Sequence, residues 1–309
     1  LKSYLQSIPQ PFTLAVETTY NWYFFVDLSE QYAQKVFLAN SYELKAFAKQ
    51  HKKNDKIDAR LIADILYKGF LPKVTIADPQ TRQMRELLRS RLTLVSDRTR
   101  NIARLKGLLD KLGDITHRRL TTDKGLAGID PSNFSITYAQ IIHDYKDRVQ
   151  YLTKKIYEVN KRITAMAMTN TDIKNLETIP GIGYFSAALI QSELIDVARF
   201  SSFNRLCAYA GLACKVSDSA NKSFRGPLNK NRRKYLQWIL LEDALHFIQA
   251  IPEKKERFEA IKERKGHNTA KVVLARDLLK IIYHVLKERR PFYYEKEDSQ
   301  IQSMAVAAL

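Results

Sequence analysis

The longest regular pattern of hydrophobic positions lies between about residues 81 and 112. Its apolar side chains recur in steps of three, four and seven, at Leu88, Leu92, Val95, Ile102, Leu105, Leu109 and Leu112. This spacing is a heptad repeat, which is typical of a helix packed along a seam against another helix. Because so long a helix is rarely stable alone, we expect a coiled-coil partner. That partner is either a second copy of the chain or the apolar helix predicted near residues 136–166.

The first part of the chain alternates between strand-like and helix-like patterns. Residues 12–16 and 35–38 are short apolar runs that contain β-branched and aromatic residues, as strands do. Helical patterns lie beside them, near residues 20–33, 41–50 and 55–68. Such alternation predicts a parallel sheet, although two strands are fewer than a stable sheet usually has. We therefore expect an incomplete α/β domain, followed by a connector from Pro72 to Pro79.

The rest of the chain has helical patterns. Its composition changes near Asn175, where small residues precede a basic run and then Leu-rich helices up to about residue 290. The predicted organisation is an α/β domain, a long helical region, a helical domain and a poorly ordered tail, at residues 1–72, 73–170, 171–290 and 291–309. The expected fold class is α+β, mostly α.

Composition and charge narrow the class of protein. The chain has 309 residues, 45% of them hydrophobic, and a formal net charge of +18. This is the composition of a folded protein, and the excess positive charge favours a polyanionic partner, most often nucleic acid. No run is apolar enough for a membrane span, and the start of the chain lacks a signal-peptide pattern. Two cysteines and scattered histidines fit neither a disulfide scaffold nor a zinc finger, so we expect a reducing environment.

The first candidate for chemistry is a glycine turn, Ile-Pro-Gly-Ile-Gly at residues 179–183. Gly181 and Gly183 allow positive φ angles and the close approach of another backbone. The free N–H groups at the start of the next helix can then hold a phosphate. The pattern is similar to the helix-hairpin-helix turn, which binds the DNA backbone without reading its sequence. An ordinary tight turn between two helices is the alternative interpretation.

The second candidate is a basic segment that contains several serines. Between Arg199 and Tyr235 the chain has nine Lys or Arg residues and one acidic residue, Asp218. Ser217, Ser219 and Ser223 lie inside it, where cations can hold a phosphodiester while a hydroxyl attacks phosphorus. The candidates for phosphate binding are Lys222, Arg225, Lys230, Arg232 and Arg233. The alternative is a basic loop that only contacts phosphates.

The third candidate is a set of carboxylates. Glu17 follows the first predicted strand, and Asp55 and Asp58 stand three apart in a predicted helix, on one face. Carboxylates at a strand end and on one helix face can bind Mg²⁺, which neutralises a phosphodiester and activates a nucleophile. The alternative is helix capping, with Asp55 as the cap and Asp58 in the first turn.

Together these motifs resemble the DEDD transposases of the IS110 family of bacterial insertion sequences. The matching segments are AVETT at 15–19, NDKIDARLIA at 54–63, IPGIG at 179–183, RF at 199–200, YAGL at 209–212, the basic run to 236, and AKVVLAR at 270–276. They occur in family order over nearly the whole chain, which makes the resemblance more specific than any single motif.

The resemblance implies a RuvC-like, RNase H-type domain in which Glu17, Asp55 and Asp58 match the second, third and fourth Mg²⁺-binding acidic positions. It also implies a C-terminal transposase domain whose nucleophilic serine is Ser219, seven residues after Leu212. In such enzymes the serine forms a covalent link to a DNA phosphate, and a neighbouring subunit supplies the acidic site. A structured RNA of the element selects the DNA. The expected partners are DNA, a guide RNA and further copies in a homodimer or homotetramer, at the nucleoid in the bacterial cytoplasm.

The chain departs from the family pattern near its N-terminus and around the serine. Residues 1–11 contain no Asp or Glu, so the first acidic position has no match, and an N-terminally truncated transposase is expected. Ala220 replaces the usual Gly after the serine, so Ser217 stays the alternative nucleophile. The sequence thus predicts either an RNA-guided, Mg²⁺-dependent transposase or a non-catalytic remnant that binds nucleic acid, and leaves open whether this chain is an enzyme.

Overall fold

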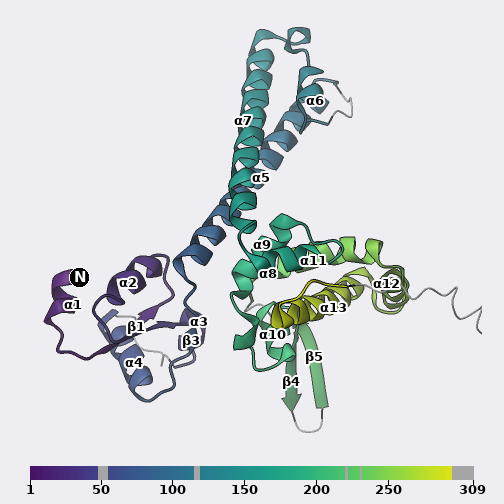
Figure 1. Ribbon diagram of the computed structural model, residues 1–309. Helices are drawn as coiled ribbons and strands as arrows, with labels where there is room; N and C mark the ends of the chain where they lie inside the picture. The colour runs from purple at the N-terminus through teal and green to yellow at the C-terminus, as the bar shows by residue number, and fades with distance from the viewer. Residues whose placement is uncertain (48–54, 115–118, 220–221, 230–231, 294–309) are drawn as a thin grey trace, which may run out of the picture. The chain divides into compact units, whose positions relative to one another are not determined.

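The computed structural model describes residues 1–47, 55–114, 119–219, 222–229 and 232–293, with the elements labelled in Figure 1. The chain divides into two compact units, Leu1–Asp78 and Pro79–Leu309. Each unit has a hydrophobic core of its own.

The first unit contains a three-stranded sheet. Strands β1 (Thr13–Glu17) and β2 (Lys35–Ala39) are parallel, and helix α2 (Trp22–Ser29) connects them. The two-residue strand β3 (Lys73–Val74) pairs antiparallel with β2, which gives the order β1-β2-β3. The predicted parallel pair is confirmed, whereas the segment expected to be only a connector also forms a third strand.

Three further helices complete the first unit: α1 (Lys2–Ser7), α3 (Ser41–Leu44) and α4 (Asp55–Tyr67). Helix α4 packs on one face of the sheet, where its Ile65 joins a buried cluster with Ala39. Leu38 neighbours Ala39 in β2 and is buried on the opposite face, because successive strand side chains alternate. The sheet is therefore covered on both faces, as strands in parallel sheets normally are.

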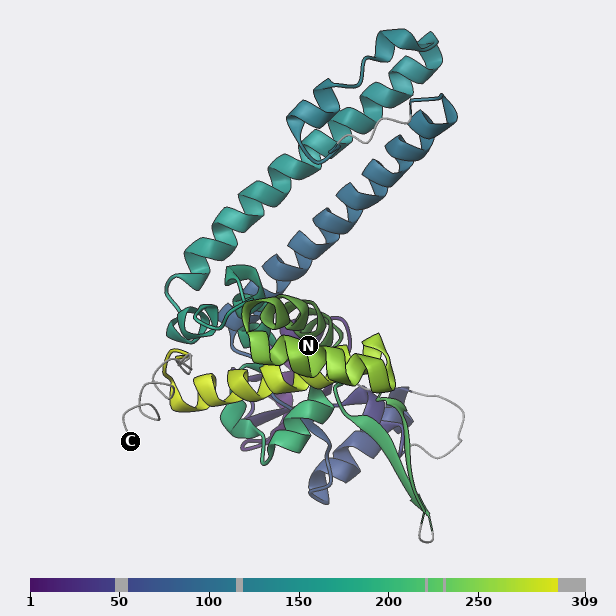
Figure 2. The ribbon, with the colours of Figure 1, turned by 90° about the vertical axis from the view of Figure 1, so that its right-hand side faces the viewer.

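The second unit begins with two long helices that lie side by side. Helices α5 (Pro79–Lys111) and α7 (Ile136–Ala167) pack in opposite directions, as Figure 2 shows. Leu88 and Leu105 of α5 and Val149 of α7 are fully buried, so the heptad pattern did identify the packed face. The long helix is confirmed, and one of its two expected partners is present in the same chain. The other, a second copy, stays a prediction.

The far end of this hairpin has its own small core. The connection between the two helices includes α6 (Asp123–Ala127) and a short 3-10 helix, η1 (Pro131–Asn133). Buried side chains of the connection and of both long helices form one cluster, made of Leu105, Leu109, Leu120, Leu126, Ile129, Ile142 and Val149. This cluster is separate from the main core of the unit.

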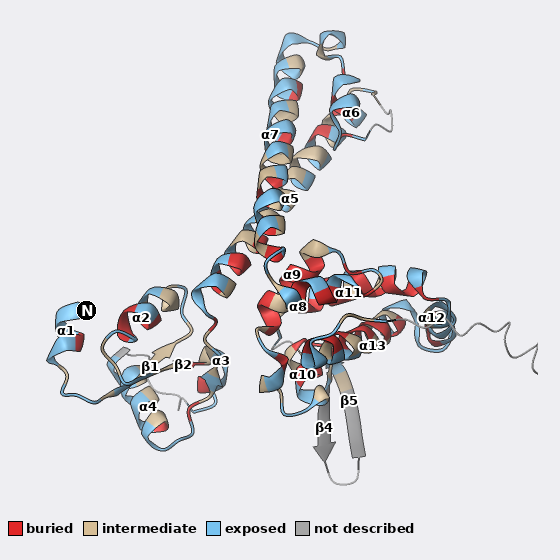
Figure 3. Cartoon of the chain, viewed as in Figure 1, coloured by how far each residue is buried: buried red, intermediate tan, exposed pale blue. Residues whose placement is uncertain are grey.

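The remaining residues form a helical body. Its elements are α8 (Thr171–Glu177), α9 (Tyr184–Leu194), the 3-10 helix η2 (Val197–Arg199), α10 (Phe203–Tyr209), α11 (Lys234–Ala250), α12 (Pro252–Lys265) and α13 (His267–Glu288). Figure 3 shows the buried positions concentrated where α9, α11 and α13 meet. Ala187 and Ala188 of α9 are fully buried, and such small side chains let neighbouring helices approach closely.

A β-hairpin, which the sequence did not predict, separates α10 from α11. Its strands β4 (Cys214–Ser219) and β5 (Lys222–Leu228) are antiparallel. The protein is thus mostly helical with small sheets, which confirms the α+β, mostly α class. Most of the expected tail, residues 294–309, lies outside the described residues. None of the described helices is long and apolar enough to cross a lipid bilayer.

Candidate functional site

Glu17 is the last residue of β1, at the carboxyl end of the two parallel strands. It stands opposite Ala39 of β2, and directly paired residues project from the same face of a sheet. Ala39 is fully buried in the cluster that contains Ile65 of α4. Glu17 therefore lies on the face of the sheet that α4 covers.

Asp58 is in the first turn of α4 and is half-buried. Leu61, Ile62 and Ile65 follow it by three, four and seven residues and pack in the cluster with the sheet. Helix positions at these spacings share a face, so Asp58 lies on the sheet-facing side of α4. The packing thus places Glu17 and Asp58 on facing sides of one sheet–helix layer.

The third predicted ligand, Asp55, is the first residue of α4, but its side chain lies outside the described residues. Among the side chains that are described, no three His, Cys, Asp or Glu residues group as metal ligands. The three-carboxylate Mg²⁺ site therefore stays a prediction, with Glu17 and Asp58 as its described members.

Two observations indicate that these two carboxylates are suited to bind a cation. Within the described part of the chain, no hydrogen bond or ion pair joins the carboxylate of Glu17 or Asp58 to another residue. The backbone beside Glu17 is also held in place, because the Thr18 and Ser41 hydroxyls are 2.7 Å apart and Ser41 N–H donates to the Thr18 hydroxyl at 3.1 Å. Half-buried carboxylates without a partner favour a positively charged ligand.

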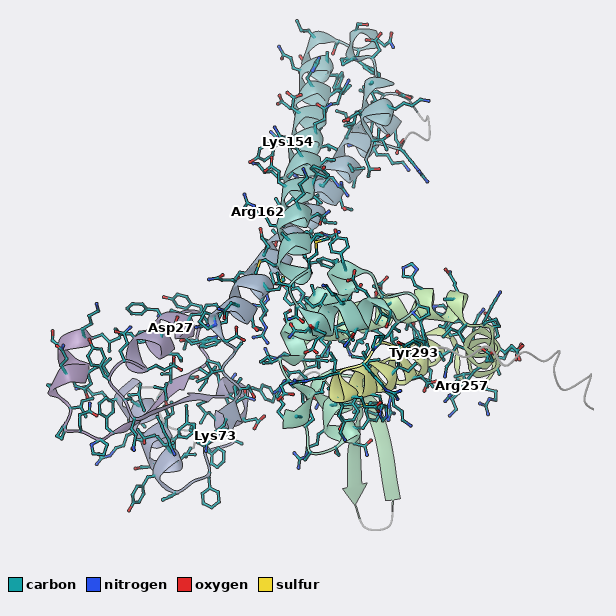
Figure 4. The ribbon with its side chains drawn as sticks, viewed as in Figure 1. Asp27, Lys73, Lys154, Arg162, Arg257 and Tyr293 are labelled. Atoms are coloured by element: carbon teal, nitrogen blue, oxygen red, sulfur yellow. The ribbon has the colours of Figure 1, made fainter. Side chains whose placement is uncertain are left out.

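Sequence reasoning missed a basic residue on the same face, Lys73 of β3. Lys73 pairs with Ala39, so Glu17, Ala39 and Lys73 form one row across the sheet. Its ammonium group lies 4.1 Å from the centroid of the Phe37 ring, and Figure 4 labels it. At a strand spacing of about 4.8 Å, the backbones of Glu17 and Lys73 are roughly 10 Å apart. A strand of two residues leaves no pattern that could have revealed this position.

The candidate serines lie in the β4–β5 hairpin rather than in a loop. Ser219 is the last residue of β4 and pairs with Lys222, while Ser217 pairs with Phe224. Arg225 pairs with Val216, next to an irregularity in the register. The side chains of residues 215–225 lie outside the described ones, as does Lys230. The roles of the serines, Lys222, Arg225 and Lys230 therefore stay predictions.

The root of this hairpin, meaning the residues just before β4 and just after β5, is hydrogen-bonded and tied to helix α10. Asn229 N–H donates to the Ala213 carbonyl, and Arg233 N–H donates to the Tyr209 carbonyl, both at 3.1 Å. Gly211 has a φ of +75°, and a Cβ there would lie 2.6 Å from Cδ of Arg232. Arg232 and Arg233, two predicted phosphate ligands, are thus fixed at the root of the hairpin.

The glycine turn connects α8 to α9, and its two glycines have different surroundings. Gly181 has a φ of +89°, and a Cβ there would lie 2.6 Å from the backbone nitrogen of Phe247 in α11. Gly183 is exposed at the start of α9, where a Cβ would meet nothing within 4 Å. Gly181 is therefore required for packing, and Gly183 is the better candidate for a contact with a nucleic-acid backbone.

A buried acid lies directly behind this turn. The Ser186 hydroxyl in the first turn of α9 donates to Oδ1 of Asp243 in α11 at 2.8 Å. Asp243 is 4% exposed. Burial raises its pKa to about 7, the Ser186 hydrogen bond opposes that rise, and neighbouring Glu242 adds to it. Close to neutral pH, Asp243 therefore exists partly in its protonated form.

Comparison with known protein families identifies the class of protein to which this chain belongs. Residues 1–113 match the DEDD-type IS110 transposase model, and residues 173–259 match the transposase model of the IS116/IS110/IS902 family. The two matches cover most of the chain and fall in both of its units. The protein belongs to the IS110 family of transposases.

Individual relatives agree with the family. The chain is 23% identical over 269 residues to the transposase for insertion sequence element IS1111A of Coxiella burnetii, which covers 82% of this chain and 72% of the relative. It is 22% identical over 252 residues to a probable family 20 transposase of Pseudomonas aeruginosa, covering 78% and 75%. The pilin gene-inverting protein of Moraxella bovis is 27% identical over 154 residues, covering 49% and 47%. As an insertion-sequence transposase, the protein has DNA as its partner.

Proposed function

We propose that this transposase cuts and joins DNA through a serine nucleophile, with Ser219 in that role. The Ser219 oxygen forms a bond to a backbone phosphorus while the bond from phosphorus to a deoxyribose oxygen breaks. The leaving oxygen gains a proton in place of the one that the serine loses. A deoxyribose hydroxyl of the second DNA then attacks the phosphoserine, which restores the serine and joins the strands.

Glu17, Asp55 and Asp58 hold Mg²⁺ in this proposal. When bound, Mg²⁺ supplies positive charge that neutralises the phosphodiester. Glu17 and Asp58 are suited to bind it because both are half-buried and without partners among the described residues, on facing elements. Carboxylate oxygens are the protein ligands that Mg²⁺ prefers.

One observation carries the proposal: models of one transposase family match residues 1–113 and 173–259, the two segments that contain the candidate carboxylates and the candidate serines. The net charge of +18 supports DNA and a structured guide RNA as partners. The DNA backbone binds at Gly183, Lys222, Arg225, Lys230, Arg232 and Arg233. Because the acidic residues and the serine belong to different units, a homodimer or homotetramer can combine them from two subunits.

The test is a trap for the covalent intermediate. The full chain is mixed with labelled DNA of the element's ends, Mg²⁺ and RNA from the same locus, and a DNA–protein adduct is sought on a denaturing gel. We expect an adduct that Ser219→Ala abolishes, while the matched change Ser217→Ala retains it. Glu17→Gln is expected to lower the yield without changing DNA affinity. An adduct that survives Ser219→Ala but not Ser217→Ala transfers the role to Ser217.

A second candidate function is nucleic-acid binding without strand transfer, which the charge of +18 alone supports. It predicts binding that tolerates any sequence and weakens steeply with salt, because phosphate contacts release counterions. It also predicts no adduct from any version of the protein. Tight salt-dependent binding with no adduct would favour this candidate over the catalytic one.

A further inference from the structure

The start of α11 is surrounded by basic residues, where a helix normally has acidic or capping ones. Its N-cap residue, Arg233, makes no side-chain cap, and its first turn contains no acidic residue. The first backbone N–H groups of a helix have no acceptor within it, and those of residues 234–236 have none among the described residues. Because positive side chains at this end oppose the helix dipole, the arrangement favours a bound anion.

Three guanidinium groups lie near this helix end, those of Arg85 and Arg89 of α5 and that of Arg233. A fourth, that of Arg199 in η2, stacks on the neighbouring Tyr209 ring. Arg233 Nε donates to the Tyr209 hydroxyl at 2.8 Å, and the Arg199 guanidinium lies 4.5 Å from the Tyr209 ring. The Arg89 guanidinium lies 5.4 Å from the ring of Tyr235, in the first turn of α11. Helix α5 and the start of α11 therefore bring several positive charges close together.

Two acidic side chains lie beside these arginines. Glu193 is nearly fully buried and pairs with Arg89 at 3.2 Å, and the exposed Glu86 pairs with the same arginine at 3.3 Å. The Tyr209 hydroxyl donates to the Glu193 carbonyl at 3.0 Å, which fixes the tyrosine between the arginines. Glu86 thus pairs with Arg89, whereas the buried charge of Glu193 acts on both Arg89 and Arg85.

Arg85 is the second, independent sign of a missing anion. It is 4% exposed, and its Nε donates to the Ser192 carbonyl at 2.7 Å. Its Nη2 is buried without a hydrogen-bond partner among the described residues. Burial lowers the pKa of Arg85, Glu193 opposes this, and Arg233 and Arg89 lower it further. A buried guanidinium that is both short of a partner and repelled by its neighbours is costly unless an anion offsets it.

We propose that the N-terminus of α11, with Arg85 and Arg233, binds one phosphate group of the DNA backbone. Guanidinium groups and helix N–H groups are the donors that hold phosphate oxygens. This inference deepens the proposed function, since it rests on DNA binding, but it does not depend on which serine is the nucleophile.

The bound phosphate is distinct from the one that is attacked. The site lies at the root of the hairpin, because Tyr209 and Arg233 flank it in the chain. Ser219 lies at the other end of β4, which spans about 17 Å at 3.3 Å per residue. That distance corresponds to about five base pairs along a duplex. The site therefore positions the DNA relative to the hairpin and takes no part in the chemical step.

The experiment measures binding of a labelled DNA duplex to the full chain over a series of salt concentrations. Arg233→Gln is expected to weaken binding about tenfold and to lower the slope of log K against log salt by about one phosphate contact. Arg85→Met acts in the same direction and is expected to raise the unfolding temperature in the absence of DNA. The matched control is Lys154→Gln, which removes an exposed charge from α7 (Figure 4) and is expected to leave affinity within twofold.

A second arm separates the two sources of phosphate. Inorganic phosphate is compared with chloride at equal ionic strength, and the unfolding temperature is measured. Stabilisation of the wild type that Arg233→Gln abolishes shows that a free phosphate group suffices, whereas a response to the duplex alone shows that the site needs the DNA strand. Equal duplex affinity for Arg233→Gln and Lys154→Gln would overturn the proposal. Ser219→Ala is expected to keep full affinity, so loss of the adduct in that variant bears on the nucleophile alone.

Discussion

The buried acid behind the glycine turn gives the most direct test of the structure. Asp243 has a pKa of about 7 in the folded protein against an ordinary value of 3.8, because its environment disfavours the charged form. The folded state therefore holds the proton more tightly than the unfolded chain does. The change Asp243→Asn replaces the protonated acid by a neutral group of nearly the same shape, which can still accept the Ser186 hydrogen bond.

The sign and size of the effect follow from proton linkage. Between pH 3.8 and about 7 the folded state binds more protons than the unfolded state, so this contribution to stability falls as pH rises. Above the folded pKa both states are deprotonated and the loss levels off. For these two pKa values, the wild type loses roughly 2–3 kcal/mol relative to Asp243→Asn between about pH 5 and pH 8.

The assay is urea unfolding of both proteins at about pH 5 and pH 8. Other groups titrate in both proteins, so the informative quantity is the difference between their free energies of unfolding. We expect the variant to gain roughly 2–3 kcal/mol in free energy of unfolding, relative to the wild type, between these pH values. The control Glu242→Gln changes the adjacent, exposed acid, which pairs with Lys271, and is expected to keep most of the pH dependence. A difference that stays constant with pH would refute the burial argument.

Three further predictions concern packing. Gly181→Ala is expected to destabilise the helical body by roughly 2–4 kcal/mol, because it combines a positive φ with a clash at Phe247. The measurement is thermal unfolding. The control is Gly183→Ala, which is expected to change the stability by under about 1 kcal/mol. Leu105→Ala is expected to destabilise the buried cluster at the far end of the α5–α7 hairpin by about 2–5 kcal/mol. The measurement is amide exchange, which should become faster in that cluster but not in the helical body. Thr18→Val removes the bonds to Ser41 and is expected to cost about 1–2 kcal/mol in the first unit, measured as amide exchange in β1; unchanged exchange would contradict it.

The elements that could be predicted from the sequence were those with a regular pattern of apolar residues. The heptads of α5 and the apolar runs of β1 and β2 have one strongly preferred packing, so their existence and type followed directly. β4 reads Cys-Lys-Val-Ser-Asp-Ser, which has no consistently apolar face, and β3 has only two residues. Neither strand offers the alternation by which half-buried strands are recognised.

The residues of the candidate sites also divide into those that could be proposed from the sequence and those that could not. Glu17, Asp58 and the serines could be proposed from the sequence because carboxylates at a strand end and hydroxyls among cations have a chemical meaning before any fold is known, and their roles stay predictions. Arg85 and Asp243 were missed because they lie in helices where charged residues are normally solvated. Burial decides their properties, and burial is set by contacts between segments distant in the chain.

The two-core construction of the α5–α7 hairpin has a mechanical consequence. No residue of α5 between Leu88 and Leu105 is fully buried, a stretch of about 25 Å. There Arg91 bonds to Asn160 at 3.1 Å instead of filling an apolar seam. The packing of the hairpin is therefore densest at its two ends, with Ile156 of α7 as the buried apolar side chain between them. We expect bending of the hairpin to concentrate at mid-span, so that its tip changes position while the packing of the body is kept.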